Sequence, residues 1–226
     1  MNANSISVSL AVNLAILGCG QAANTILLVD SFSDQLSIDL SSTTGYMSNT
    51  MIIIDPGSSL DEAVREINFT VTANPFFDDA IFGLGYLGAT GIATYDTGPG
   101  VVSKMELKYT PKTALDVTGS TGLTLDLLFT DRPMDLTLVL GDAGGESSQT
   151  LHLPGGAFTK QSIYFPLDQF SRAVDLEGVN SIGLFVDPDT SADFAFDSLS
   201  FVSVPEPQTA LLSLGAVFFG LLRRRR

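Results

Sequence analysis

Apolar and polar residues alternate with a period of two along most of this chain, and the longer period typical of amphipathic helices is nearly absent. The alternation is clear in residues 36–40, 67–71, 105–109, 123–129, 136–140, 163–165 and 182–186. In a strand this pattern turns every second side chain toward a buried face. Segments rich in glycine, proline and aspartate separate the runs and indicate turns. The pattern predicts an all-β fold, a two-sheet antiparallel β-sandwich that is jelly-roll-like.

Two segments depart from simple alternation. In residues 193–202, Phe194 and Phe196 share one parity, whereas the later apolar residues Leu199 and Phe201 have the other. This change predicts a β-bulge near residues 197–198. Residues 82–100 are rich in glycine and have little periodicity, so we expect either a flat hairpin of small residues or a long surface loop.

The C-terminus has three ordered parts. An extended motif comes first, an apolar stretch follows at residues 208–222, and four arginines end the chain. The motif is Pro205, Glu206 and Pro207, and the arginines are Arg223, Arg224, Arg225 and Arg226. As a helix, the apolar stretch would be roughly 22 Å long, which is short for a hydrocarbon core of about 30 Å. We expect a marginal transmembrane helix whose arginines stay cytoplasmic, so that everything before residue 205 lies across the membrane.

This order of parts resembles the PEP-CTERM sorting tail of Gram-negative bacteria. In that family an exosortase, a membrane enzyme, recognises the tail. The resemblance implies cleavage near residues 205–207, a transient membrane anchor, and delivery to the cell surface or the extracellular space. The alternative is a plain C-terminal anchor that is never removed.

The N-terminus has the features of an export signal. Residues 6–18 are apolar, and Gly20 and Ala22 provide the small residues that a signal peptidase requires before its cleavage site. We expect a signal helix within residues 1–22, a β-sandwich domain over 23–204 and the sorting tail over 205–226. Cys19 allows a lipoprotein acceptor as the alternative.

The expected domain is strongly acidic. Between the two signals lie 24 acidic and 7 basic residues, a formal charge of −17. This charge excludes nucleic acid as a partner, because binding to phosphates needs the opposite sign. The domain contains no cysteine outside the signal, so burial must stabilise it without disulfides. The chain has no tryptophan, and we expect its 15 phenylalanines to form much of the core.

Few residues offer reactive chemistry. His152 is the only histidine, and alternation in Leu151-His152-Leu153 predicts that it faces solvent, which argues against a serine hydrolase or a zinc site. Asp187, Asp189 and Asp193 surround a proline turn and are candidate calcium ligands. Turn formation and solvation are the alternative roles for these aspartates. Apart from such a structural calcium ion, no cofactor is expected.

Tyr86 and Tyr95 lie in the glycine-rich segment and are candidate platforms for a sugar ring, with packing at the sheet edge as the alternative. The segments 27–32 and 193–201 resemble the first and last strands of the β-sandwich found in many exported PEP-CTERM proteins, which is similar to galactose-binding-like and carbohydrate-binding modules. The resemblance implies this fold, and our first hypothesis is a non-catalytic structural or adhesive protein of the cell surface. The alternatives are an exopolysaccharide-binding module and, third, an enzyme that acts on polysaccharide.

Overall fold

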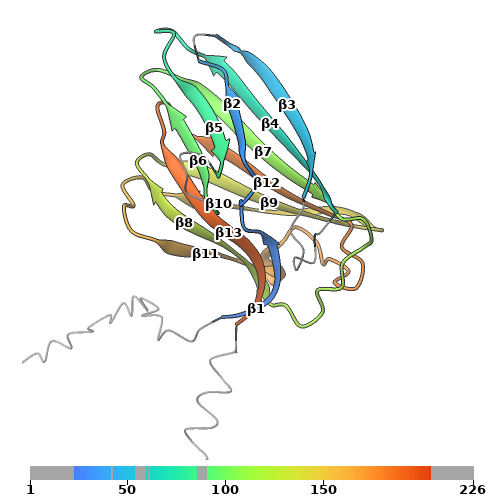
Figure 1. Ribbon diagram of the computed structural model, residues 1–226. Coiled ribbons are helices and arrows are strands. Elements are labelled where there is room, and N and C mark those ends of the chain that lie inside the picture. The colour runs from blue at the N-terminus through green and yellow to red at the C-terminus, as the bar shows by residue number, and fades with distance from the viewer. Residues whose placement is uncertain (1–22, 42, 54–59, 61, 86–90, 205–226) are drawn as a thin grey trace, which may run out of the picture. The chain divides into compact units, whose positions relative to one another are not determined.

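The computed structural model describes residues 23–41, 43–53, 60, 62–85 and 91–204 (Figure 1). Within these ranges the chain forms thirteen strands, one 3-10 helix, η2 (Leu167–Gln169), and no α-helix. The strands are β1 (Asn24–Asp30), β2 (Leu36–Asp39), β3 (Gly45–Ile52), β4 (Val64–Ala73), β5 (Ala80–Leu84), β6 (Ala93–Thr97), β7 (Val102–Thr110), β8 (Gly122–Thr130), β9 (Met134–Asp142), β10 (Gly145–Leu153), β11 (Gln161–Pro166), β12 (Ser181–Pro188) and β13 (Phe194–Ser203).

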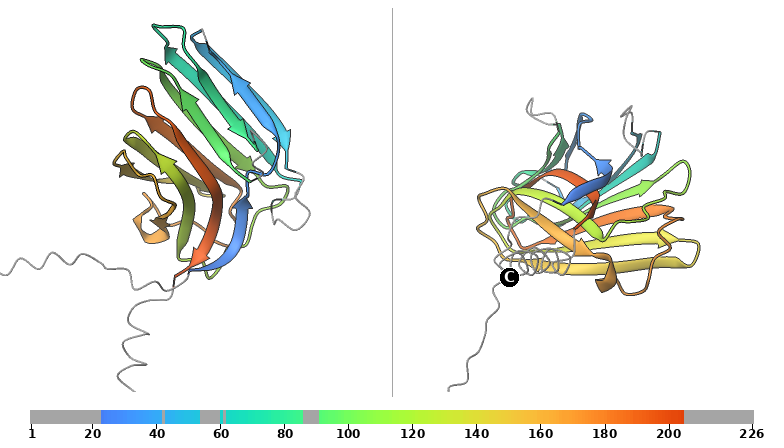
Figure 2. Two further views of the ribbon diagram at one scale, coloured as in Figure 1. Left: turned by 60° about the vertical axis from the view of Figure 1, so that its left-hand side comes forward. Right: turned by 90° about the horizontal axis from the view of Figure 1, so that it is seen from below.

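The strands form two antiparallel sheets that stack as a sandwich (Figures 1 and 2). The seven-stranded sheet has the order β11-β8-β13-β6-β5-β2, and β1 also pairs with β13. The six-stranded sheet has the order β10-β9-β12-β7-β4-β3. The predicted all-β, two-sheet antiparallel sandwich is therefore confirmed. The helices expected in residues 1–22 and 208–222 lie outside the described residues, within which no helix is long and apolar enough to cross a membrane.

The alternation seen in the sequence decides which side chains enter the core. In β8, Leu123, Leu125 and Leu127 are fully buried, whereas the residues between them are half-buried. The phenylalanines with at most 1% of their surface exposed are Phe32, Phe69, Phe82, Phe165, Phe194, Phe196 and Phe201. Each such ring contributes about 1.5–3 kcal/mol by leaving water, so the expected phenylalanine-rich core is confirmed.

Strand β13 lies inside the seven-stranded sheet and contains the predicted bulge. Phe196 pairs with Leu127 and Ser198 pairs with Asp126, which leaves Asp197 as an extra residue. The bulge changes the parity of burial along the strand. On its other edge, β13 pairs with β6 along its first half and with β1 along its second half (Figure 2).

The glycine-rich segment contains a hairpin. Strands β5 and β6 pair antiparallel, from Ala80 opposite Thr97 to Leu84 opposite Ala93. The hairpin alternative is therefore confirmed for the described part of this segment. The hairpin is not built of small residues alone, because Phe82, Leu84 and Tyr95 are buried in the core.

Candidate functional site

A groove of about 580 Å³ lies on the outer face of the six-stranded sheet. All six strands of the sheet contribute side chains that point away from the core. Its polar and aromatic lining includes Tyr46, Asn68, Thr70, Lys104, Glu106, Asp135, Thr137, Ser148, Phe185 and Asp187. A groove of this volume has the size of a ligand site, and its lining is mostly polar.

Phe185 lies on β12 near the middle of this face. Its cross-strand neighbours are Glu106 on β7 and Thr137 on β9, and 37% of its surface is exposed. Gly183 precedes it on the same face, and a Cβ atom there would lie 3.1 Å from Phe185 Cε2. The ring therefore leans over Gly183, which has no side chain to push it away. A second hollow of about 240 Å³ also borders Phe185 and extends toward Lys108.

A hydrogen-bonded network lies beside the ring. The Tyr46 hydroxyl on β3 donates to Asn68 Oδ1 on β4 at 2.5 Å. Asn68 Nδ2 donates to Glu106 Oε2 on β7 at 3.1 Å and to Glu66 Oε1 at 3.3 Å. These bonds fix the orientation of the Asn68 amide between two carboxylates, of which Glu106 lines the groove. Carboxylates held in this way can accept hydrogen bonds from ligand hydroxyl groups.

An ion pair and a hydrogen-bonded histidine–aspartate pair lie along the next row of the same face. Lys104 Nζ lies 2.6 Å from Asp187 Oδ2, and His152 Nδ1 lies 2.8 Å from Asp135 Oδ1. His152 is exposed, as the sequence predicts. All four side chains are more than half exposed, so these pairs contribute little to stability. Their donors and acceptors remain accessible to a ligand in the groove.

The structure does not bring Asp187, Asp189 and Asp193 together as a calcium site. Asp187 is paired with Lys104, and the Asp189 N–H donates to the Pro133 carbonyl at 2.9 Å. Among the described residues, no cluster of three or more acidic, histidine or cysteine side chains could hold a metal ion. The calcium prediction is therefore corrected: Asp187 belongs to β12 and pairs with Lys104, whereas Asp189 and Asp193 lie in the β12–β13 connection and make separate hydrogen bonds.

Asp193 has a structural role instead. Its Oδ1 accepts the Thr97 backbone N–H at 2.9 Å, and its own N–H donates to Asp131 Oδ1 at 2.7 Å. Burial, opposed by the Thr97 hydrogen bond and assisted by the charges of Asp96 and Asp131, raises the pKa of Asp193. The carboxyl group therefore ties the strand β6 to the start of β13.

Tyr95 lies in the core rather than on a surface platform. Only 1% of it is exposed, and its ring stacks on Phe194 with centroids 4.3 Å apart and meets Phe69 edge to face. Its hydroxyl shares a short hydrogen bond with Ser103. This burial removes Tyr95 from the candidates for a sugar platform. Tyr86 lies outside the described residues, as do Pro205, Glu206, Pro207 and the four terminal arginines.

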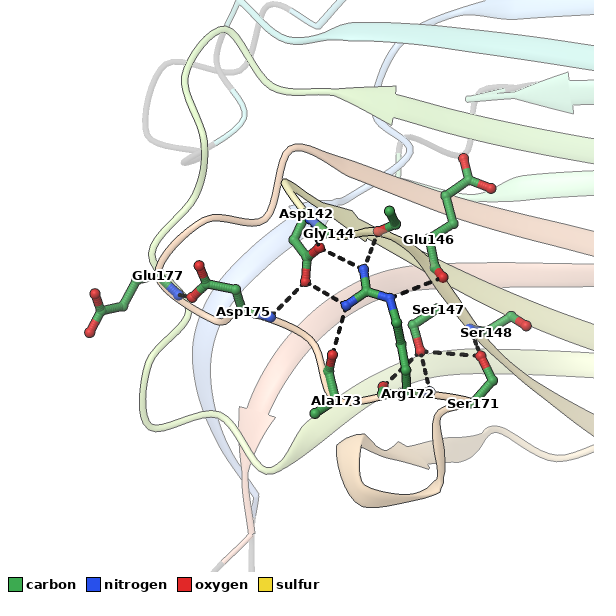
Figure 3. A network of polar contacts seen from close by, with 11 residues as sticks. Asp142, Gly144, Glu146, Ser147, Ser148, Ser171, Arg172, Ala173, Asp175 and Glu177 are labelled. Atoms are coloured by element: carbon green, nitrogen blue, oxygen red, sulfur yellow. Dashed lines mark hydrogen bonds and ion pairs between the residues drawn. The ribbon is translucent and has the colours of Figure 1, made fainter.

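Arg172 stabilises the turn at one end of the six-stranded sheet (Figure 3). Its guanidinium group binds both oxygens of Asp142, at 2.6 and 2.9 Å, and donates to the carbonyls of Ala173 and Gly145. These bonds from Arg172, together with the Asp175 backbone N–H, hold the pKa of Asp142 far below its usual range. The contacts join the β9–β10 turn to the loop after η2, a role in the fold rather than in the groove.

Residues 203–226 match the family model for the PEP-CTERM protein-sorting motif. The chain carries a PEP-CTERM sorting motif. The motif contains the predicted Pro205-Glu206-Pro207. Its first residue, Ser203, is the last residue of strand β13, and Val204 follows directly. A PEP-CTERM motif implies processing by an exosortase and export with a C-terminal membrane-anchor signal. No curated protein sequence matches this chain.

Solved structures similar to this chain include carbohydrate-binding modules. The solution structure of CtCBM11 is 12% identical over 83% of this chain and 99% of that chain, with a TM-score of 0.44. A family 11 module from Clostridium thermocellum, in complex with a beta-1,3-1,4-mixed-linked tetrasaccharide, is 10% identical over 75% and 97%, with a TM-score of 0.37. PfGH50B is 12% identical over 77% of this chain, which spans only 24% of PfGH50B, with a TM-score of 0.40. Likenesses this distant assign no ligand to this chain.

Tyr46, Asn68, Glu106 and Phe185 were not predicted as site residues. One signal for Phe185 is present in the sequence, because a large aromatic residue occupies a polar position of the alternation Ile182, Leu184, Val186. The other three residues have no such signal. They occupy ordinary outward positions of their strands, and only the pairing of β3, β4, β7 and β12 brings them together.

Proposed function

We propose that this chain is an exported cell-surface protein whose β-sandwich binds carbohydrate in the outer-face groove without acting on it. The observation that supports this proposal is the half-exposed Phe185 ring beside the ordered network of Tyr46, Asn68 and Glu106. A sugar ring has a face of C–H groups and a rim of hydroxyl groups. The aromatic ring suits the apolar face, and the fixed carboxylate and amide groups suit the hydroxyls.

The destination of the protein agrees with this ligand class. A signal peptidase would release the chain at about Ala23, and an exosortase of a Gram-negative bacterium would process residues 205–226. The jelly-roll-like domain, residues 23–204, would then meet exopolysaccharide at the cell surface. A purely structural or adhesive sandwich remains the second candidate function. A structural role does not require a groove, whereas the arrangement around Phe185 favours binding. An enzyme that acts on polysaccharide is the third candidate.

Affinity measurements on the full-length chain, purified in detergent, test this proposal. A glycan array followed by titration with soluble polysaccharides identifies a ligand. The affinity of Phe185→Ala for that ligand is then compared with the affinity of the wild type. Phe185 is the central aromatic contact, so we expect its removal to weaken binding roughly 30-fold, equivalent to about 2 kcal/mol.

Phe158→Ala is the matched control, because Phe158 is 73% exposed and does not line the groove. It should leave affinity unchanged. Equal losses in both variants, or the absence of binding to every glycan tested, would contradict a carbohydrate site in the groove and leave the structural role.

A further inference from the structure

Strand β3 is an open edge of the six-stranded sheet. It ends the strand order and pairs with β4 on one side, and no described strand pairs with its other side. Its eight residues, Gly-Tyr-Met-Ser-Asn-Thr-Met-Ile, include neither a charge nor a proline. Tyr46, Met47 and Ile52 are 61%, 40% and 59% exposed. Free backbone N–H and C=O groups on an uncharged edge of this length invite pairing with another strand.

The other strands that end the two sheet orders have features that oppose such pairing. Strand β2 has only four residues, β11 ends in Pro166, and β10 contains Glu146 and His152. Short edges, prolines and charges are the devices that natural sheets use against edge-to-edge association. Strand β3 has none of these devices.

The side chains of β3 are complementary to a second β3 in one antiparallel register. With Asn49 opposite Asn49, Tyr46 faces Ile52 and Met47 faces Met51 of the other copy, while Ser48 faces Thr50. Apolar residues thus meet apolar ones on both faces, and polar residues meet polar ones.

Alternative registers lose this match. A shift that centres the pair on Ser48 places Met47 opposite Asn49 and Tyr46 opposite Thr50. A shift that centres it on Thr50 places Ser48 opposite Ile52. Registers shifted by one residue would turn the side chains of one copy to the wrong face of the sheet.

We propose that two copies of this chain pair through β3, antiparallel, about a two-fold axis between their Asn49 residues. The interface is isologous, since each copy presents the same surface to the other.

The absence of charge on β3 favours pairing through this edge. In a chain of net charge −14, most surfaces of two copies repel each other, whereas β3 brings no charge to the contact. The two six-stranded sheets then form one continuous sheet, with both grooves on the same face. A polymer could engage both grooves at once; that consequence rests on the proposed function, and the pairing itself does not.

A cysteine on the two-fold axis tests the register. Asn49→Cys is introduced into a Cys19→Ser background, and the full-length chain in detergent is oxidised and run on a non-reducing gel. Directly opposed residues of an antiparallel pair have Cα atoms about 4.5–5.5 Å apart, within the range of a disulfide. We expect a covalent dimer from this variant and none from Glu177→Cys, an exposed loop control.

Sedimentation of the full-length chain tests the interface without oxidation. Asn49→Lys places two ammonium groups opposite each other and should raise the dimer dissociation constant roughly fivefold or more, whereas Glu177→Lys should not. Asn49 is only half-buried on an edge strand, so circular dichroism should show a folded Asn49→Lys monomer. A wild-type chain that stays monomeric at about 100 μM overturns the pairing. So does a dimer that is unaffected by Asn49→Lys and gives no Asn49→Cys disulfide. Glycan affinity, measured separately, decides the groove proposal.

Discussion

Arg65 Nη1 lies 2.6 Å from Asp30 Oδ2 inside the sandwich, and the two side chains are 0% and 3% exposed. Arg65 belongs to β4 of one sheet and Asp30 to β1 of the other, so the ion pair joins the layers. The Tyr109 hydroxyl donates to the same carboxylate oxygen at 2.8 Å, and Asp34 Oδ2 accepts from Arg65 Nη2 at 2.7 Å. Burial, followed by the Asp30 charge, raises the pKa of Tyr109 well above its usual range, so the phenol remains a donor.

Arg65→Met should strongly destabilise the domain. The substitution leaves the Asp30 carboxylate buried without its cation, and breaking a buried pair in this way typically costs about 3–5 kcal/mol. Urea denaturation measures the loss. Lys112→Met removes the exposed Lys112–Glu62 ion pair and should change the midpoint little. Similar midpoints for the two variants would show that the buried pair is not a major support of the fold.

Asp142→Asn should alter the dependence of stability on pH. The pKa of Asp142 is lower in the folded chain than in the unfolded chain, because Arg172 and the Asp175 N–H bind the carboxylate. Its ionisation therefore stabilises the fold above the unfolded pKa of about 3.9, and this contribution is lost as the pH falls toward the folded-state pKa. The difference in urea midpoint between wild type and variant should be wide at pH 6 and narrow steadily toward pH 2. A difference that is constant over this range would contradict the assignment.

Gly183→Ala should weaken glycan binding without unfolding the protein. The new Cβ would lie 3.1 Å from Phe185 Cε2, so the ring must move from its position over β12. We expect roughly tenfold weaker binding, together with an unfolding free energy that is unchanged or higher by less than about 1 kcal/mol, since glycine is unfavourable within strands. Gly45→Ala is the control, because its Cβ would meet no atom within 4 Å. If Gly183→Ala binds glycan with unchanged affinity, the orientation of the Phe185 ring does not contribute to binding.

The sorting motif predicts a defined change in mass. In a host with an exosortase, the surface fraction should lack the segment after residues 205–207, and changing Arg223, Arg224, Arg225 and Arg226 to alanine should reduce delivery while leaving the domain folded. Intact-mass spectrometry of the surface fraction measures the cleavage, and the amount of the protein in that fraction measures delivery. A surface species that retains Arg226 would support a permanent anchor.

Much of the fold was predictable because the relevant signals are local. A period of two identifies a half-buried strand from a few neighbouring residues, and the parity change at Asp197 locates the bulge in β13. The site was less predictable. Tyr95 has the sequence context of an exposed tyrosine, yet it is buried because Phe69 and Phe194 from other strands cover it.

The sequence by itself determined the clearly alternating strands and the face that each of them buries, the acidic charge and the sorting motif, since each depends on residues close together in the chain. Strands β3 and β10 were not predicted, because apolar and polar residues do not alternate clearly along them. Only the tertiary structure decided that Tyr46, Asn68, Glu106 and Phe185 share one groove. These residues come from four strands whose order in the sheet, β3-β4-β7-β12, reflects non-local backbone pairing. The outward side chains of half-buried strands look alike in sequence, and the pairing of strands selects which of them become neighbours.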